Sequence, residues 1–277
     1  MKKVLAFGGR GFVGSKVVQN LNNLDVTTFD RSQGNKNHVQ GNILSKEDVK
    51  KAVKNKDVII NFVGLTPIKQ PRNGYKELHV NAVKNIIANL KAKQIYIHIS
   101  AIGANSDSNI SYLETKGVAE EHIQKNHEKH FIVRPSIIYD TEGELIPLLI
   151  KTSWLRFFPK IPLKIQPVHR DDVANVIRLR VKGKTRKKVV EIAGLEKYEF
   201  WEFAKIIKKS LGYNQYNIPF PLYKAAMLLL TIIPGVPISL NQVRSLQEDF
   251  TTKNNYLDNK KPITFSKWVK NQTFHQT

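Results

Sequence analysis

A short glycine-rich stretch near the start of the chain carries the clearest chemical signal in the sequence. Gly8, Gly11 and Gly14 form a G-x-x-G-x-x-G pattern within the run Gly8-Gly9-Arg10-Gly11-Phe12-Val13-Gly14. Glycines at this spacing allow a tight turn, a close approach of a pyrophosphate and close packing of a helix on a strand. The start of the following helix would offer N–H groups and a positive dipole to the phosphates. The pattern predicts a dinucleotide site, and a plain structural turn is the alternative.

An acidic residue stands where such a site would hold the adenosine ribose. Asp30 follows Gly8 by 22 positions and ends an apolar run. A carboxylate there accepts hydrogen bonds from ribose hydroxyls and repels a 2′-phosphate, which favours NAD. Arg10 and Arg31 favour NADP instead, because two guanidinium groups could clamp a 2′-phosphate, although Arg31 could equally be a solvated turn residue. The sequence leaves both cofactors open.

Apolar periodicity predicts alternating strands and helices around these residues. The predicted strands cover Lys3–Phe7, Val26–Phe29, Asp57–Val63, Gln94–Ser100, His130–Val133 and Lys188–Ala193. The predicted helices cover Phe12–Leu24, a segment beginning at a Ser45–Asp48 capping box, Tyr75–Lys91, Tyr112–Gln124, Asp171–Val181 and Glu199–Leu211. This order predicts an α/β protein with a doubly wound parallel sheet, the Rossmann fold.

The pattern becomes looser after Pro135, where prolines divide the chain into short pieces. We therefore predict an NAD(P)-binding Rossmann core over residues 1–165, to which residues 166–195 return. Residues 196–277 would form a small, mostly helical part on the substrate side, ending in a polar tail.

Composition and charge exclude several classes of protein. The 277 residues carry a formal net charge of +21, and 41% of them are hydrophobic, which excludes wholesale disorder. The absence of cysteine excludes disulfides and thiolate catalysis. A dense basic run over residues 178–188 fits a solvated helix end, or a face for an anionic membrane or an acidic partner. Nucleic acid is disfavoured, because no aromatic residue interrupts the run.

Apolar segments set the expected location. No secretory signal is recognisable after Met1, because the first apolar run breaks into glycines. The apolar stretch Ala225–Ile233 is far shorter than the roughly 20 residues of a membrane-spanning helix. It could be a buried cap helix, or its outer side could be an interface. We expect a cytoplasmic protein with a fraction attached peripherally to the inner membrane, which high salt would release.

Other catalytic motifs are absent from the sequence. The stretch Gly183-Lys184-Thr185 resembles the end of a P-loop, but Arg178 stands where the first glycine is required. The sequence has no H-x-x-x-H pair for a metal and no G-x-S-x-G elbow. We therefore expect no metal site.

Several later segments resemble one superfamily when taken together with the glycine loop. These segments are Asn61-Phe62-Val63-Gly64, Ser100-Ala101-Ile102-Gly103-Ala104, Tyr112-Leu113-Glu114-Thr115-Lys116, Arg134-Pro135-Ser136-Ile137-Ile138-Tyr139 and residues 166–174. They resemble the extended and atypical short-chain dehydrogenase/reductases, which include NAD-dependent epimerases and dehydratases. Within that superfamily, the sequence is similar to the branch of the nucleotide-binding accessory subunit of respiratory complex I.

The resemblance implies roles for individual residues. It places Val63, Gly64 and Pro135 beside the cofactor, and Asn42 near the adenine, where the family usually has an acid. It makes Tyr112 the proton-transferring residue and Lys116 the residue that holds the nicotinamide ribose, two positions that share one helix face. Ser100 would steady the substrate oxygen, but apolar residues follow it where catalytic members carry hydroxyls, so Ser100 could instead bond a backbone group.

Two functions therefore remain open. In the first, the protein holds NAD(P) and docks on a respiratory or other membrane complex, as the resemblance implies. In the second, it is an NAD(P)-dependent reductase or nucleotide-sugar epimerase or dehydratase that uses Tyr112 and Lys116.

Overall fold

The chain folds into two compact units, each made from separate stretches of sequence. The computed structural model describes residues 1–34, 36–66, 74–219, 221, 222, 224, 225, 249–258 and 260–274. The first unit comprises Met1–Pro135 with Arg170–Ile192, and the second comprises Ser136–His169 with Ala193–Thr277. The domain limits expected from the sequence, at residues 165 and 196, remain a prediction. The structure groups Ser136–His169 with the second unit.

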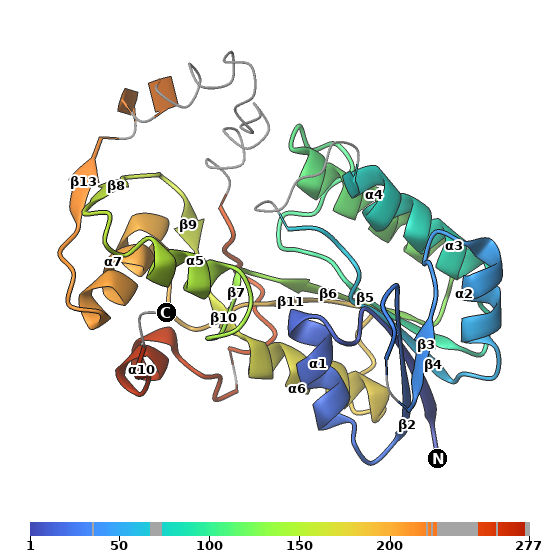
Figure 1. Ribbon diagram of the computed structural model, residues 1–277. Helices are drawn as coiled ribbons and strands as arrows, with labels where there is room; N and C mark the ends of the chain where they lie inside the picture. Colours follow the sequence, from blue (N-terminus) through green and yellow to red (C-terminus); the bar gives the residue numbers. More distant parts are fainter. Residues whose placement is uncertain are drawn as a thin grey trace. The chain divides into compact units, whose positions relative to one another are not determined.

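A seven-stranded parallel sheet forms the centre of the first unit (Figure 1). Its order is β11-β6-β5-β4-β1-β2-β3. The strands are β1 (Lys3–Phe7), β2 (Asp25–Asp30), β3 (His38–Gln40), β4 (Val58–Asn61), β5 (Ile95–Ile99), β6 (His130–Pro135) and β11 (Val189–Ile192). All residues of β4 are buried, as a strand between two helix layers requires. The predicted Rossmann fold is confirmed.

Helices cover both faces of this sheet (Figure 1). One layer consists of α1 (Phe12–Asn20) packed against α6 (Arg170–Val181). The other layer consists of α2 (Lys46–Val53), the π-helical turn η1 (Lys76–Asn81), α3 (Ala82–Ala88) and α4 (Ser111–Asn126). The predicted cap of α2 is present, because the Ser45 hydroxyl accepts a hydrogen bond from the Asp48 N–H at 3.2 Å.

Three local expectations differ from the structure. Helix α1 ends at Asn20 instead of Leu24, and Leu21 closes it by donating its N–H to the Val18 carbonyl at 3.1 Å. Strand β3 was not expected, since it is short and largely exposed and shows no apolar alternation. The single helix predicted over Tyr75–Lys91 is divided, because η1 precedes α3.

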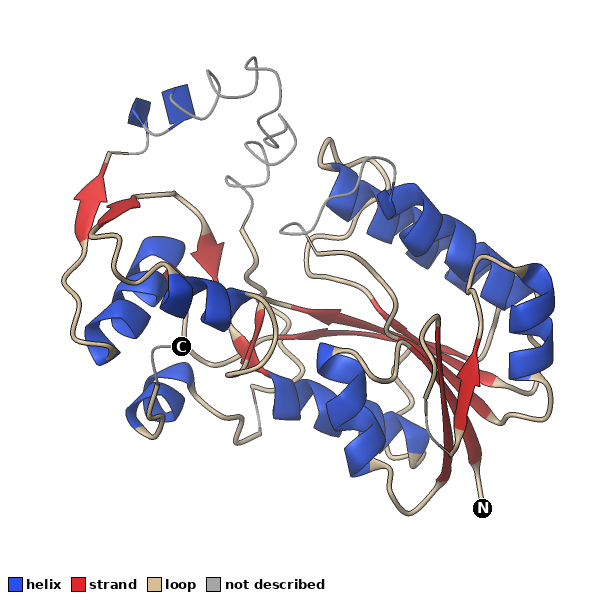
Figure 2. Cartoon of the chain, viewed as in Figure 1, coloured by secondary structure: helices blue, strands red, loops and turns tan. Residues whose placement is uncertain are grey.

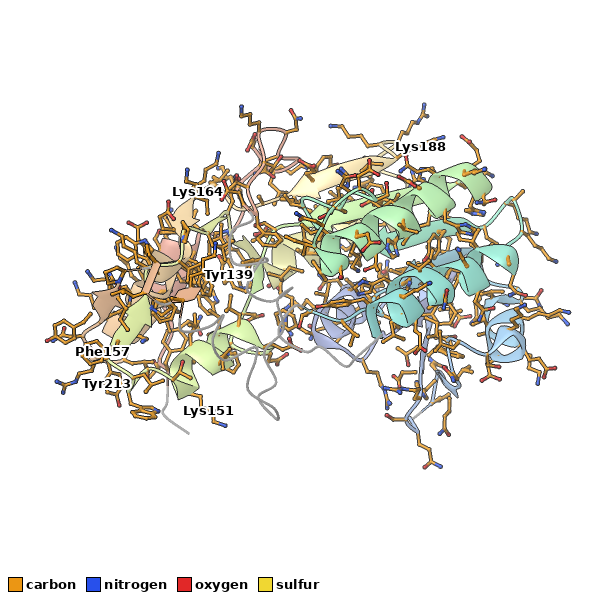
Figure 3. The ribbon with its side chains drawn as sticks, turned by 90° about the horizontal axis from the view of Figure 1, so that it is seen from above. Tyr139, Lys151, Phe157, Lys164, Lys188 and Tyr213 are labelled. Carbon is orange, nitrogen blue, oxygen red and sulfur yellow. The ribbon has the colours of Figure 1, made fainter. Side chains whose placement is uncertain are left out.

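The second unit has its own aromatic core. Phe203 and Phe265 stack with ring centroids 4.1 Å apart, and the Tyr139 hydroxyl donates to the Ile263 carbonyl at 2.9 Å. Tyr139 is labelled in Figure 3. The described part of this unit includes the helices α5 (Leu145–Lys151), α7 (Phe200–Ser210) and α10 (Phe265–Lys270). Its short strands pair as β7 (Ile138–Tyr139) with β10 (Val168–His169), β8 (Phe157–Pro159) with β13 (Tyr216–Ile218), and β9 (Lys164–Ile165) with β12 (Tyr198–Glu199).

Within the described part of the chain, no helix combines the length and the apolar character needed to cross a bilayer. The apolar segment Ala225–Ile233 lies outside the described residues except for Ala225. The choice between a cap helix and an interface therefore stays a prediction.

Candidate functional site

The glycine loop joins β1 to α1 in a conformation that only small residues allow. Gly8 has a φ of 67°, the left-handed region that side chains disfavour. A Cβ at Gly14 would lie 2.4 Å from the Gly8 carbonyl oxygen and 2.8 Å from Gly9 Cα. Both contacts are with backbone atoms, so the loop has no room for a larger residue. Without side chains in the way, the backbone of this turn could be approached closely by the phosphates of a dinucleotide.

The start of α1 is held in place by the start of α6. Gly11 is the N-cap of α1, and no side chain caps the helix there. The Arg170 guanidinium lies 5.1 Å from the centre of the Phe12 ring, and Arg170 Nη1 donates to the Phe12 carbonyl at 3.4 Å. Lys16 and Asp171 form an ion pair at 3.0 Å. Val13 lies on the same first turn of the helix. The role of Arg170 was not predicted from the sequence, although this residue lies within residues 166–174, which carry part of the family resemblance.

Arg10 and Asp30 are joined directly. Arg10 Nε donates to Asp30 Oδ2 at 2.7 Å, and Nη2 donates to Oδ1 at 2.5 Å. Nη1 donates to the Gln33 carbonyl at 2.7 Å. The hydrogen bond from Arg10 keeps the pKa of Asp30 below its ordinary value. The two residues that gave opposite cofactor preferences in the sequence are therefore a single bidentate pair.

The other two residues expected near the adenosine lie in surface turns. Arg31 is exposed, and its carbonyl accepts a hydrogen bond from Gln40 Nε2 at 3.0 Å. The Asn42 side-chain oxygen accepts from the Leu44 N–H at 3.0 Å, and the Asn42 N–H donates to Asp48 at 2.9 Å. Part of the hydrogen-bonding capacity of Asn42 is thus used to shape the turn before α2.

Replacing Asp30 with asparagine should shift cofactor preference toward NADPH. The substitution removes the negative charge and the bidentate partner, so the Nε and Nη2 donors of Arg10 become available to a 2′-phosphate. We expect the affinity for NADPH relative to NADH to rise by about tenfold or more. Fluorescence titration of both reduced cofactors measures the ratio. If Asp30→Asn left the affinity for NADPH relative to NADH unchanged and Arg31→Ala lowered it, phosphate binding would be assigned to Arg31 instead.

After β4, the side chain of His79 connects a backbone turn to helix α4 by hydrogen bonds. The Val63 N–H donates to Asn61 Oδ1 at 3.0 Å, and Gly64 and Leu65 follow. The Leu65 N–H donates to His79 Nε2 at 3.0 Å, so the proton of the neutral ring is on Nδ1. His79 Nδ1 lies 3.0 Å from the Thr115 hydroxyl on α4. His79 thus links the turn after β4 to the helix that carries Tyr112 and Lys116.

Lys116 is buried at the ends of β4 and β5. Its Nζ donates to the Ile99 carbonyl at 2.8 Å, and a Cβ at Gly64 would lie 3.2 Å from it. Burial lowers the pKa of Lys116 to about 8. The next residue after Ile99 is Ser100, whose buried Oγ has no hydrogen-bond partner among the described residues. The alternative in which Ser100 only bonds a backbone group is not seen there.

Tyr112 lies on α4, beside the rings of Tyr75 and His79. Its ring lies 5.8 Å from the Tyr75 ring and 5.7 Å from the His79 ring, measured between centroids. Burial and Tyr75 raise the pKa of Tyr112 above its ordinary value. This direction is opposite to the one expected from a neighbouring lysine. At the end of β6, the Pro135 carbonyl accepts the Ile102 N–H at 3.0 Å.

The histidine link was missed from the sequence, and it predicts acid sensitivity. Burial, with Lys116 and His98, lowers the pKa of His79 to about 2. Below about pH 6.5, His79 binds a proton in the unfolded chain but not in the folded one. As the pH is lowered further, the free energy of unfolding therefore decreases by about 1.4 kcal/mol per pH unit because of this residue. His79→Gln should remove that part of the slope, as measured by urea unfolding between pH 7 and pH 5. Equal slopes in both proteins would contradict it.

The arrangement fits a dinucleotide along the carboxyl ends of the parallel strands. The glycine turn packs the start of α1 directly on the backbone of Gly8 and Gly9, and the buried Ser100 hydroxyl has no partner among the residues that the structure describes. Gly8–Gly14 and Asp30 would hold the adenosine side, while Lys116 and Tyr112 lie toward the strands β4 and β5. Bound NAD(P) supplies hydride chemistry, and the residues here can orient it.

This chain has a parallel Rossmann sheet, a glycine turn after β1 and an acid at the end of β2. These features together are typical of the class of dinucleotide-binding proteins. The model of a family described as NAD(P)H-binding matches residues 8–179. The chain belongs to this family, and its cofactor is NAD(P).

Among curated proteins, the chain is similar to NADH dehydrogenase (ubiquinone) 1 alpha subcomplex subunit 9, mitochondrial. It is 29% identical to the protein of Dictyostelium discoideum over 217 residues, which cover 76% of this chain and 56% of the relative. It is 24% identical to the Mus musculus protein over 240 residues, covering 78% of this chain and 63% of the relative. The matches thus span less than two thirds of either relative's length.

Solved structures show the same fold at low identity. The dTDP-4-dehydrorhamnose reductase of Bacillus anthracis, in complex with NADP, has a TM-score of 0.73 at 15% identity and covers 98% of each chain. The dTDP-glucose 4,6-dehydratase of the same organism, in complex with NAD, has a TM-score of 0.65 at 18% identity, covering 79% of this chain and 85% of that one.

Proposed function

We propose that the protein holds NAD(P) as a structural ligand and docks as an accessory subunit on a respiratory membrane complex. The similarity to a subunit of NADH dehydrogenase over 76% of the chain carries this proposal. The site agrees with it, because Ala101 and Ile102 follow Ser100 where catalytic members have hydroxyls, and the pKa of Tyr112 is raised. Such a site binds a dinucleotide firmly and turns it over poorly.

Native purification from membranes tests the docking. The tagged full chain, expressed at its natural level, should co-purify with respiratory NADH dehydrogenase subunits after mild detergent extraction. The tag alone, expressed from the same promoter, serves as the control. Recovery of the protein without any respiratory subunit would contradict the proposal.

For its location, we propose the cytoplasm, with a fraction attached to the inner membrane. The relatives are named as mitochondrial proteins, which supports an association with a respiratory membrane. Cell fractionation should find part of the protein with the membranes, and high salt should release it without detergent. A protein that needs detergent for release would contradict peripheral attachment.

An enzymatic role is the second candidate, because the Ser100 hydroxyl is buried without a partner among the described residues. In this reading, Tyr112 donates or accepts the proton in an NAD(P)-dependent reduction, epimerisation or dehydration. Tyr112→Phe removes one hydroxyl and keeps the ring, so turnover should fall about a hundredfold or more while cofactor affinity changes little. Steady-state kinetics with nucleotide sugars or small carbonyls measures this. Turnover equal to that of the unmodified protein would dismiss Tyr112 as the catalyst.

A further inference from the structure

The edge of the sheet where the strands begin carries a row of lysines. In sheet order β11, β6, β5, β4 and β1, a lysine stands one or two positions ahead of every strand, namely Lys188, Lys129, Lys93, Lys56 and Lys2. The five strands are parallel, so these lysines share one edge, with neighbouring strands about 4.8 Å apart. Figure 2 marks this edge by the N-terminus, which lies at the start of β1.

The dense basic run noted in the sequence belongs to the same edge. Lys2 Nζ donates to the carbonyl of Val181, the last residue of α6, at 2.8 Å. The turn from α6 to β11 therefore lies beside the start of β1. Its cationic side chains are exposed, and they belong to Lys182, Lys184, Arg186, Lys187 and Lys188. Figure 3 shows the last of these extending away from the ribbon beside β11. We call the row of lysines, this turn and Lys3 the basic edge.

Few carboxylates balance the basic edge. Among the described residues at the strand starts, the carboxylates beside its ten cations are Asp25, Asp57 and Glu128. Glu128 is paired with Lys188, and Asp57 accepts the Lys3 N–H at 2.8 Å. No ion pair is found for Lys93 or Lys184 within the described part of the chain. The edge thus keeps a strong excess of positive charge over a continuous surface.

The chemistry of the basic edge fits lipid headgroups. Nine of its ten cations are lysines, which are flexible, hydrated point charges without the fixed fork of arginine. Such charges suit a laterally mobile anionic surface better than one rigid bidentate partner. A hollow of about 420 Å³ is lined by Lys2, Lys56 and Lys93 together with Asp57, so three lysines outnumber one carboxylate where a headgroup phosphate would enter. No aromatic residue stands in the turn from α6 to β11 for bases to stack on.

We propose that the basic edge docks on the surface of an anionic phospholipid bilayer. Parallel strands hold a dinucleotide at their carboxyl ends, and the basic edge lies at their amino ends. The two surfaces are therefore at opposite ends of the same strands, and lipid docking leaves the nucleotide site open. This surface goes beyond the accessory-subunit function and would serve an enzyme equally well.

Vesicle flotation with matched charge variants tests the basic edge. The probes are vesicles of phosphatidylcholine alone and of phosphatidylcholine with phosphatidylglycerol, at low and high salt. The edge variant is Lys93→Glu with Lys184→Glu, two exposed side chains outside the nucleotide site. The control variant is Lys46→Glu with Lys84→Glu, which changes the net charge equally in a groove between α2, α3 and α4. NADPH titration of every protein verifies that the first unit is folded.

The unmodified protein should float with the anionic vesicles at low salt and be released at high salt. The edge variant should bind at least about tenfold more weakly, whereas the control variant should bind nearly as well as the unmodified protein. If both variants lost vesicle binding equally, the effect would depend on net charge alone, and the proposal would be overturned. The proposal would also be overturned if the unmodified protein did not float with anionic vesicles. It would be overturned equally if the protein bound single-stranded RNA as tightly as the vesicles and the edge variant lost that binding too. Because docking on a respiratory complex is tested by co-purification and nucleotide binding by NADPH titration, failure here is distinguishable from failure of the accessory-subunit function.

Discussion

Replacing Lys116 with methionine is expected to make the protein more stable and, at the same time, to weaken its binding of NAD(P)H. Among the described residues, the buried ammonium donates to one carbonyl, that of Ile99, and burial lowers its pKa to about 8. At pH 7 the folded protein must therefore keep a charge that water would solvate far better. Methionine fills a similar volume without charge, so the free energy of unfolding should rise by about 1–3 kcal/mol.

The same substitution removes the cation beside Gly64, so NAD(P)H affinity should fall by about tenfold or more. Lys208→Met in the second unit is a matched control, because Lys208 is also buried and donates to one carbonyl, Leu155, at 2.7 Å. It should leave NAD(P)H binding unchanged. Urea unfolding and fluorescence titration give the two quantities. Unaltered NAD(P)H affinity in Lys116→Met would remove Lys116 from the nucleotide site.

The stability gain should also depend on pH in a defined direction. Between about pH 8 and pH 10.5, the unfolded chain keeps a proton on Lys116 that the folded one has lost. The unmodified protein should therefore become more stable as pH rises through this window, and the methionine variant should not share this contribution.

Gly14→Ala should abolish nucleotide binding, because the added methyl group meets backbone that cannot move aside. The Cβ would lie 2.4 Å from the Gly8 carbonyl oxygen, so β1 and α1 must separate or the loop must change shape. Either response misplaces the backbone that would contact the pyrophosphate. We expect NAD(P)H affinity to fall by more than about a hundredfold and the free energy of unfolding to fall by about 1–3 kcal/mol.

Gly212→Ala provides the comparison for Gly14→Ala. Gly212 has a φ of 82°, but a Cβ there meets nothing within 4 Å. This substitution strains the backbone by about 1–2 kcal/mol without a clash, and it lies in the second unit. NAD(P)H titration should detect no change in it. Normal binding by Gly14→Ala would show that the glycine loop tolerates a side chain and would contradict its role.

Features fixed by neighbouring residues were predictable from the sequence. The β1–α1 turn depends on glycine spacing, and the strand VIIN of β4 is apolar on both faces, so both could be read directly. Tyr112 and Lys116 share a helix face because they are four residues apart. Strand β3 was not predicted from the sequence, because it forms by pairing with β2, as in the pair Thr28 and His38, and has no apolar pattern of its own.

Features that depend on distant contacts could not be read. His79 and Thr115 are 36 residues apart, and the Arg10–Asp30 pair joins a loop to a strand end 20 residues away. The only local hint of His79 was a histidine within a largely apolar helix pattern. The π-helical turn at Lys76–Asn81, a form that is frequent at functional sites, left no signature in the periodicity. The raised pKa of Tyr112 likewise depends on its burial in the fold and on Tyr75, neither of which the local sequence reveals.

The interleaving of the two units sets the order in which this protein can fold on the ribosome. The chain leaves the first unit after Pro135, returns at Arg170 and leaves again after Ile192. Until β11 is synthesised, β6 has no neighbour on one side, and α1 lacks α6, so a nascent chain exposes an apolar strand edge. At about 5–20 residues per second, the 57 residues from Ser136 to Ile192 take roughly 3–11 seconds to translate. During that interval the nascent chain exposes the free edge of β6, and a chain that stops between Pro135 and Arg170 lacks both α6 and the last strand of the sheet.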